Sequence, residues 1–289
     1  MTKGILLIAL GRPQYGNLAA NLAASIRYTS DIPIHVVYTE GSLSHLSKEH
    51  LSLFTSTAIC PPEIYKGDKK EYIRAKTHMY DLSPFDETIF LDVDMVILPG
   101  KNMADELAKL SEICDFTMET RGYADLSEQQ PDNKSFWCNV NELKEAYNVV
   151  EGRFYNLHSE FVFFKKCDEN EIFFEEVKKQ YDHPLVEVRK FDNGLPDEFA
   201  FSTAMMLLQY YPHLDNFIKI YWDRMDGHID WNTKVIPNYI GFSLGGNETH
   251  KNIASKANLY NRHVRSKLNL PYEFRHLPKR QWNANRIKV

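Results

Sequence analysis

The stretch that decides the fold reads Ile89-Phe90-Leu91-Asp92-Val93-Asp94-Met95-Val96, two carboxylates set between apolar runs. Residues two apart on an extended chain point the same way, so Asp92 and Asp94 can face one ligand. Ligands of open α/β sheets bind at the carboxyl ends of strands. Two hard oxygen donors there predict a site for Mn²⁺ or Mg²⁺ bridged to a diphosphate, with Val93 between them. The plainer interpretation is a pair of acids that caps a strand end.

Strand and helix patterns alternate on both sides of this stretch. Gly4–Leu10 is a continuous apolar run, as in a buried parallel strand. Tyr15–Tyr28 carries Leu18, Leu22 and Ile26 at a spacing of four, which predicts an amphipathic helix. A second buried strand follows at Ile34–Tyr38. A strand–helix–strand unit of this kind favours a parallel sheet and the α/β class.

Weaker patterns fill in the rest of the chain. Further strands are expected at Thr88–Leu91, Met95–Leu98, Phe116–Glu119 and Phe161–Phe164, helices at Tyr72–Leu82, Met103–Leu110, Glu171–Gln180 and Glu198–Tyr210, and a polar loop at Arg121–Ser135. No internal repeat or linker interrupts this order. We therefore expect one α/β domain with a mixed, mostly parallel sheet over residues 1–250, followed by a basic extension over residues 251–289.

Composition describes an ordinary globular protein. The 289 residues are 43% hydrophobic and 25% charged, with a formal net charge of -5. The four cysteines include no Cys-x-x-Cys pair, which argues against a zinc or redox site and against a disulfide scaffold. No secretion signal or apolar run of about 20 residues is visible. These features predict a reducing, cytoplasmic location, with peripheral contact to the inner face of a membrane as an option.

Charge is distributed unevenly along the chain. Residues 251–289 contain ten Lys and Arg against the single acid Glu273, whereas residues 1–250 contain 24 basic and 38 acidic residues. A basic tail on an acidic body suggests a polyanionic partner, either nucleic acid or an anionic membrane surface. A solvated terminal helix of ordinary Lys and Arg content explains the pattern equally well, so both interpretations stay open.

A longer segment, from Arg74-Ala75-Lys76 through Leu82-Ser83-Pro84-Phe85 to the Asp92-Val93-Asp94 turn, resembles the donor site of GT-A glycosyltransferases. Within that fold, the segment is similar to glycosyltransferase family 8, the glycogenin-like group. The resemblance implies a Rossmann-like nucleotide-diphospho-sugar transferase fold. It also implies that Lys76, or failing that Arg74, contacts the phosphates or sugar of the donor. By itself, Lys76 reads as an ordinary lysine on a helix surface.

Other family features follow in the expected order. The resemblance assigns Ala9 and Tyr15 to uridine binding, although an aromatic residue at the start of a helix more often serves packing. His158-Ser159-Glu160 stands where the family has Asn-Ser-Gly. Glycine there would allow close approach of the backbone to a ligand, so Glu160 puts the sugar contacts of this strand in doubt.

The remaining candidates lie toward the C-terminus. Asp197 matches the acid that the family places beside the transferred sugar, and it also suits the N-cap of the helix that follows. The final family strand normally carries a histidine ligand, but here Gly241 or Ser243 falls near its place. His250 is the candidate third metal ligand instead, and Lys251 is the candidate for the diphosphate. A loop histidine is more often a plain surface residue.

These features together imply a metal-dependent, retaining transfer of sugar from a uridine diphosphate sugar to an acceptor hydroxyl. Two acceptor classes fit the basic tail: a glycan, including a lipid-linked one at a membrane, or a hydroxymethylated DNA base. A non-catalytic nucleotide-sugar or glycan-binding protein of the same fold is one alternative. A metal-dependent nucleotidyltransferase, which also uses paired acids, is the other.

Overall fold

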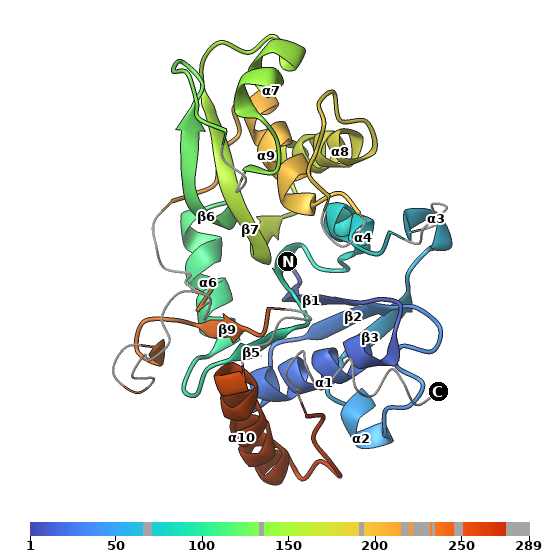
Figure 1. Ribbon diagram of the computed structural model, residues 1–289. Helices are drawn as coiled ribbons and strands as arrows, with labels where there is room; N and C mark the ends of the chain where they lie inside the picture. Colours follow the sequence, from blue (N-terminus) through green and yellow to red (C-terminus); the bar gives the residue numbers. More distant parts are fainter. Residues whose placement is uncertain are drawn as a thin grey trace. The chain divides into compact units, whose positions relative to one another are not determined.

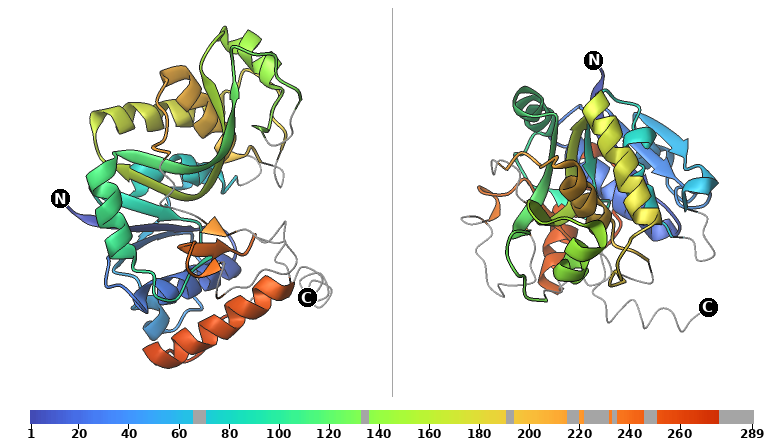
Figure 2. Two further views of the ribbon diagram at one scale, coloured as in Figure 1. Left: turned by 90° about the vertical axis from the view of Figure 1, so that its left-hand side faces the viewer. Right: turned by 90° about the horizontal axis from the view of Figure 1, so that it is seen from above.

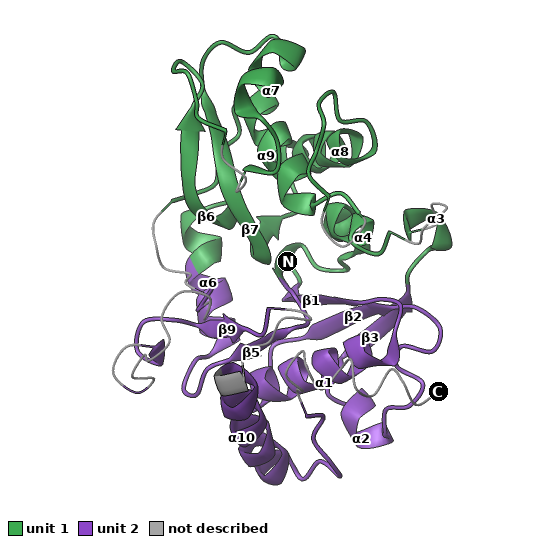
Figure 3. Cartoon of the chain, viewed as in Figure 1, with its two compact units in different colours: residues 1–2, 60–90, 110–215 green, residues 3–59, 91–109, 216–289 purple. Residues whose placement is uncertain are grey.

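The computed structural model describes residues 1–65, 71–132, 136–190, 194–214, 220–221, 232, 235–245 and 251–275. The chain divides into two compact units, shown in separate colours in Figure 3. Unit 1 comprises residues 1–2, 60–90 and 110–215, and unit 2 comprises residues 3–59, 91–109 and 216–289. The chain passes from one unit to the other within β4 and again within α6, so each unit is assembled from separate segments. The predicted division at residue 250 stays a prediction, and residues 251–275 belong to unit 2.

Unit 2 begins with a parallel sheet that the apolar runs predicted. Its elements are β1 (Lys3–Ala9), α1 (Pro13–Arg27), β2 (Ile34–Tyr38), α2 (Lys48–Leu51), β3 (Ser56–Ile59), β5 (Met95–Ile97), β8 (Ile220–Tyr221), β9 (Gly241–Ser243) and α10 (Lys251–Leu268). The strands β3, β2 and β1 pair in parallel in that order, with Ile5 opposite Ile34 and Ala9 opposite Tyr38. The sequence pattern missed β3, because its side chains are mostly exposed and it lacks an apolar run.

A second, smaller sheet lies in the same unit and joins β5, β9 and β8. Strand β5 pairs antiparallel with β9, Met95 opposite Ser243 and Ile97 opposite Gly241. A side chain at Gly241 would meet the Val96 carbonyl oxygen at 2.8 Å, so glycine is what lets the two backbones approach. The predicted strands at Met95–Leu98 and near Gly241 therefore form one paired element.

Helix α10 packs along α1, as Figures 1 and 2 show from different sides. Ile253 and Ala257 enter an apolar cluster with Val96 and Phe242 of the small sheet. The segment after α10 turns back over α1 and α2, where the amide of Asn21 donates to the Phe274 carbonyl at 2.7 Å. The start of the basic tail is thus a packed part of unit 2.

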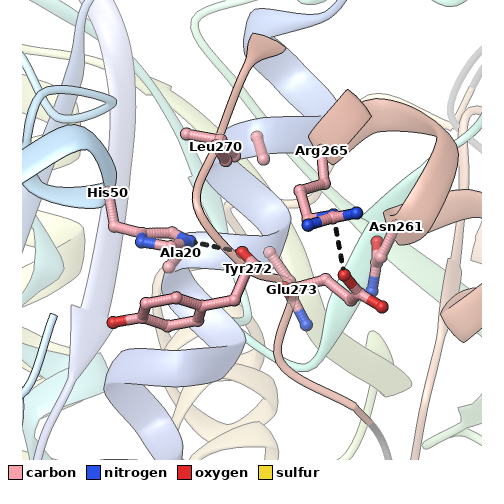
Figure 4. Close-up of a pocket in the computed structure, with 9 residues that line it drawn as sticks. Ala20, His50, Asn261, Arg265, Leu270, Tyr272 and Glu273 are labelled. Atoms are coloured by element: carbon pink, nitrogen blue, oxygen red, sulfur yellow. Dashed lines mark hydrogen bonds and ion pairs between the residues drawn. The ribbon is translucent and has the colours of Figure 1, made fainter. Parts of the chain in front are cut away.

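One acid gathers the positive charge of this returning segment. Glu273 lies 2.8 Å from Arg265, 3.6 Å from Arg262 and 4.0 Å from Arg275. Arg265 and Glu273 line a water-sized cavity of about 10 Å³. His50 and Tyr272 line it as well, and His50 Nε2 is hydrogen-bonded to the Tyr272 carbonyl (Figure 4). Three of the ten tail cations are therefore partly neutralised within the chain.

Unit 1 is built around a long antiparallel pair. Its elements are α3 (Pro62–Tyr65), α4 (Arg74–Thr77), α5 (Met79–Leu82), most of β4 (Glu87–Leu91), the end of α6 (Met103–Ile113), β6 (Phe116–Asp125), α7 (Val140–Tyr147), β7 (Arg153–Lys165), α8 (Asp168–Asp182) and α9 (Asp197–Leu208). Strand β7 pairs with β6 from Phe116 opposite Phe164 to Asp125 opposite Arg153. Its other neighbour in the sheet is β4.

Aromatic side chains fill the space between this pair and the helices α8 and α9. Phe116 on β6, Phe164 on β7 and Phe173 and Phe174 on α8 make ring contacts with centroid distances of 4.8 to 6.3 Å. Phe201 of α9 completes the cluster. The FVFF run of β7 is buried throughout, which fixes one face of the strand against the helices.

Several sequence expectations need correction. The helix expected over Tyr72–Leu82 is two short helices separated at His78, whose φ of -100° is not helical. Strand β6 runs to Asp125, so part of the polar segment expected as a loop is a strand whose exposed residues face solvent. Helix α7 was missed, although Val140, Leu143 and Tyr147 follow a helical spacing and pack in the core of unit 1. No helix in the described parts of the chain is long and apolar enough to cross a membrane.

Candidate functional site

The Asp92-Val93-Asp94 turn joins β4 to β5, as predicted. Val93 is buried at 5% exposure and anchors the turn, while Asp92 and Asp94 are half-buried. The backbone N–H of Leu244, just after β9, donates to the Asp94 carbonyl at 2.8 Å. The turn is therefore held at its centre by an apolar side chain and at its end by the small sheet. Asp92 and Asp94 flank this buried side chain on the turn.

Two carboxylates of this kind fit a hard divalent cation, but only as a partial ligand set. Across the described residues, no group of three or more His, Cys, Asp or Glu side chains is arranged to hold a metal. His250 lies outside the described residues. Lys251 is the first residue of α10, and its side chain is outside them as well. A metal here would complete its coordination with phosphate oxygens or water.

The residues predicted to bind uridine, Ala9 and Tyr15, lie at the end of β1 and the start of α1. Ala9 is fully buried at the end of β1, and the chain turns at Gly11, whose φ of 89° suits glycine. The Gly11 N–H donates to the Thr39 hydroxyl at 2.8 Å. Tyr15 lies in the first turn of α1 and is half-buried. The turn and the ring are present, and their contact with a base stays a prediction.

A second group of polar side chains is buried within unit 1. Lys76 of α4 lies 3.9 Å from Asp197 at the start of α9 and donates to the Ser159 hydroxyl of β7 at 3.3 Å. Ser159 in turn donates to Glu198 at 3.4 Å. His158 lies 3.3 Å from Glu160 on the same strand. We call these six residues the buried charge cluster: Lys76, His158, Ser159, Glu160, Asp197 and Glu198.

A β-bulge explains how one strand supplies three neighbouring members of this cluster. Met118 of β6 faces Val162, whereas the next residue, Glu119, faces His158. Residues 159–161 therefore have no ladder partner on β6, and the strict alternation of side chains is lost there. Bulges re-aim side chains in this way and are common beside functional sites.

The pKa values of the two cluster glutamates, Glu160 and Glu198, are shifted in opposite directions. Burial pushes the pKa of Glu160 upward, but His158 and the charge of Lys76 outweigh it and leave that pKa below the usual value. At 3.3 Å, His158 is close enough for charge attraction, although Glu160 Oε2 accepts no well-formed hydrogen bond. Burial, reinforced by the charge of Asp197, raises the pKa of Glu198 well above the usual value. The environment therefore favours the ionised form of Glu160 and the protonated form of Glu198.

Three polar atoms of the cluster are buried without a hydrogen bond: Asp197 Oδ2, Glu160 Oε2 and His158 Nδ1. Asp197 is 3% exposed, and its Oδ2 accepts no hydrogen bond, because Lys76 at 3.9 Å is too distant. Glu160 Oε2 and His158 Nδ1 lie 3.3 Å apart as an ion pair but make no well-aligned hydrogen bond. Buried polar groups are nearly always paired, so unpaired acceptors in a cluster point to a ligand that donates. Lys76 and His158 keep side-chain exposures of 18% and 12%, so the cluster reaches the surface at these residues.

Comparison with known proteins identifies the architecture. No family model matches the sequence, and no curated protein is similar to it. The chain does superpose on solved structures. Mouse xyloside xylosyltransferase 1 in its apo form has a TM-score of 0.51 at 11% identity, over 86% of this chain and 99% of that one. Galactosyltransferase LgtC, in complex with donor and acceptor sugar analogues, has a TM-score of 0.52 at 11% identity, over 97% and 99%. The bifunctional glycosyltransferase WbbM, also apo, has a TM-score of 0.54 at 12% identity, over 92% and 52%.

The chain has the GT-A fold. The predicted α/β class with a mixed, mostly parallel sheet is therefore confirmed. At these identities the likeness concerns the fold alone, and membership of family 8 stays a prediction.

Arg74 has a structural place in this GT-A chain. Its guanidinium makes a bidentate pair with Asp182 of α8, at 2.7 and 2.6 Å, and donates to the Ile64 carbonyl at 2.8 Å. The pair raises the pKa of Arg74 and lowers that of Asp182. Of the two basic residues proposed for the donor, Lys76 is the one that lies in the buried charge cluster.

The helix that follows Leu195 corrects one expectation. Asp197 is the first residue of α9, and Pro196 occupies the N-cap position without a side-chain hydrogen bond. A capping role for Asp197 is therefore wrong, which frees its carboxylate for the cluster. Sequence reasoning also missed Glu198 and the functional interest of His158 and Glu160. The available signal was the departure of these residues from the family pattern.

Proposed function

We propose that this protein is a glycosyltransferase that takes a sugar from a uridine diphosphate sugar. The proposal rests on the approach of Lys76 to Asp197, whose buried Oδ2 lies 3.9 Å from the lysine and accepts no hydrogen bond. The family resemblance assigns these two residues to the donor sugar, and they come from distant parts of the sequence. Sugar hydroxyls are the donors that such acceptors lack.

Other residues are proposed for the remainder of the donor. Ala9 and Tyr15 are proposed for the uridine. Asp92 and Asp94 would hold Mn²⁺ or Mg²⁺ by their carboxylates, with His250 as the proposed third ligand and Lys251 beside the diphosphate. When bound, the metal would neutralise the charge of the departing nucleoside diphosphate.

The buried charge cluster would bind the sugar. Asp197 accepts hydrogen bonds from its hydroxyls, and its negative charge stabilises the positive charge that develops at the anomeric carbon. Lys76 donates a hydrogen bond to Ser159 and lies 3.9 Å from the Asp197 carboxylate, so it would position both residues for the sugar. Glu198, which keeps its proton, can donate a hydrogen bond where Asp197 can only accept. The predicted retention of configuration belongs to this proposal.

The basic tail bears on the acceptor. Helix α10 carries no acidic residue, and Lys256, Arg262 and Lys267 are exposed on it. We propose an anionic acceptor surface, with a lipid-linked glycan at the cytoplasmic face of a membrane ahead of hydroxymethylated DNA. Sedimentation with vesicles that contain an anionic lipid, compared with gel shift of duplex DNA at the same salt concentration, separates the two.

A screen of nucleotide sugars tests the proposed function. The purified chain is incubated with each donor and Mn²⁺, and the products are identified by mass spectrometry. We expect slow release of uridine diphosphate from one donor and none in EDTA. Release of pyrophosphate would indicate a nucleotidyltransferase instead. Tight donor binding without hydrolysis or transfer would indicate the non-catalytic binding protein.

A further inference from the structure

The buried charge cluster contains more carboxyl groups than cations. Glu160, Asp197 and Glu198 supply three carboxyls, and Lys76 and His158 are the basic residues that face them. Lys76 is shared between Asp197 and Ser159, and His158 faces Glu160. Within the described residues of the cluster, each basic group therefore already faces a carboxyl. The cluster therefore holds three carboxyl groups against two basic groups.

Three buried atoms of the cluster make no hydrogen bond: Asp197 Oδ2, Glu160 Oε2 and His158 Nδ1. Two of the three are carboxylate oxygens. A hydroxyl group satisfies such an oxygen by donating to it. A carboxylate has nothing to donate and would bring a further negative charge into a poorly hydrated place, where repulsion is strong.

We propose that the sugar bound by this cluster is uncharged, and that Glu160 is the specificity-determining residue that excludes uronic acids. The inference rests on the proposed function, because it concerns the sugar of the same donor. The family has glycine at the position of Glu160, and exclusion of uronic acids would explain why this chain has a glutamate there. The bulge at residues 159–161 brings its carboxylate beside Lys76 and His158, which keep it ionised.

The test compares donors that differ by one charge. Binding of UDP-glucose and UDP-glucuronate to the full chain with Mn²⁺ is measured by calorimetry, and UDP-galactose and UDP-galacturonate form a second pair. Each pair differs only in a hydroxymethyl or carboxylate group at C6. UDP-xylose, which lacks C6, controls for size, and UDP alone controls for the nucleotide. We expect the better-bound neutral hexose donor to exceed its uronate by about tenfold or more.

Three variants assign the effect to Glu160. Glu160→Gln removes the charge and should bring the ratio of neutral to uronate affinity toward one. Glu160→Asp keeps the charge and should keep the ratio. Glu145→Gln, on the exposed surface of α7, removes a charge of the same unit outside the cluster and should leave the ratio unchanged. Thermal unfolding and UDP affinity show that each variant is folded.

The outcomes are distinct. Equal or tighter binding of the uronates by the native chain would overturn the inference and leave the proposed function standing. A folded Glu160→Gln protein with the full native ratio would remove Glu160 from the explanation. If neither UDP nor any of its sugars binds, the proposed function itself fails, and the inference fails with it.

Discussion

The two acidic sites of this chain solve opposite electrostatic problems. Asp92 and Asp94 lie two residues apart on one short turn, half-buried, and their two charges fit a cation from outside. The buried charge cluster gathers its carboxyls from β7 and α9 and offsets them with Lys76, His158 and a retained proton on Glu198. Half-buried carboxylates are still partly hydrated before a metal ion binds. Three buried carboxyl groups instead need nearby basic side chains or bound protons to offset their charge. In the proposed function, the first arrangement binds the metal and diphosphate and the second binds the sugar hydroxyls.

The sharpest separation of the two sites is expected at Asp94. Asp94→Asn should lower Mn²⁺-dependent donor hydrolysis by about 10²- to 10³-fold, because one of two carboxylate ligands is lost. It should also abolish the rise in unfolding temperature that Mn²⁺ and UDP together produce in the native chain, since a bound ligand stabilises the folded state. Near-native hydrolysis by this variant, or by the native chain in EDTA, would falsify the metal role.

Asp197→Asn should follow with a loss of about 10²-fold in turnover, because the amide cannot stabilise developing positive charge. In contrast to Asp94→Asn, it should leave the Mn²⁺- and UDP-dependent rise in unfolding temperature intact. Steady-state hydrolysis and thermal unfolding of the same preparation give both readings. Loss of the Mn²⁺ response in Asp197→Asn would show that the two sites are not separable as described.

Arg74 and Lys76 provide a matched pair on one short helix. Arg74→Ala should destabilise the protein by about 1–3 kcal/mol, because Asp182 and two carbonyl acceptors lose a charged donor. Lys76→Ala should also destabilise the protein, because it leaves the buried Asp197 carboxylate without its cation. Unlike Arg74→Ala, it should in addition weaken donor binding. Chemical denaturation and donor titration of both variants distinguish them. The reverse pattern would place Arg74, rather than Lys76, at the donor.

The smallest effect concerns the proton on Glu198. The unfolded chain loses this proton near the ordinary pKa of 4.5, whereas the native chain keeps it to a higher pH. Stability from this group is therefore present below pH 4.5 and is lost as pH rises toward the raised pKa, by up to about 1.4 kcal/mol per pH unit. Glu198→Gln should flatten this part of the profile in denaturation measured between pH 5 and 7. An unchanged slope would mean that Glu198 ionises normally.

The same contrast explains what could be predicted from the sequence. The Asp92-Val93-Asp94 turn was visible because its chemistry and its apolar flanks lie within eight consecutive residues. The sheet β3-β2-β1 was foreseen apart from its exposed edge strand, β3, whose alternation gave no apolar run. Periodicity reports burial, so it finds the strands and helices that face a core and misses those that do not.

The buried charge cluster could not be derived in the same way. Lys76, Glu160 and Asp197 are ordinary polar residues in their own segments, and only packing of α4, β7 and α9 brings them together. The bulge that aims His158 and Ser159 follows from strand register rather than from local composition. Family resemblance pointed to Lys76 and Asp197, but it treated Glu160 as a defect of the site. The structure gives that residue two charged neighbours instead.

The bulge in β7 has a consequence for how such a site can change over generations. On one side of it Val162 and the following residues are paired with β6, and on the other side Leu157 and His158 resume the pairing. Residues 159–161 lie between two stretches of β7 that are each paired with β6, so a substitution there need not break either stretch of pairing. Substitutions during evolution can therefore change the side chains proposed to contact the sugar, while the flanking parts of β7 keep their pairing. New specificity can then arise here without a new fold.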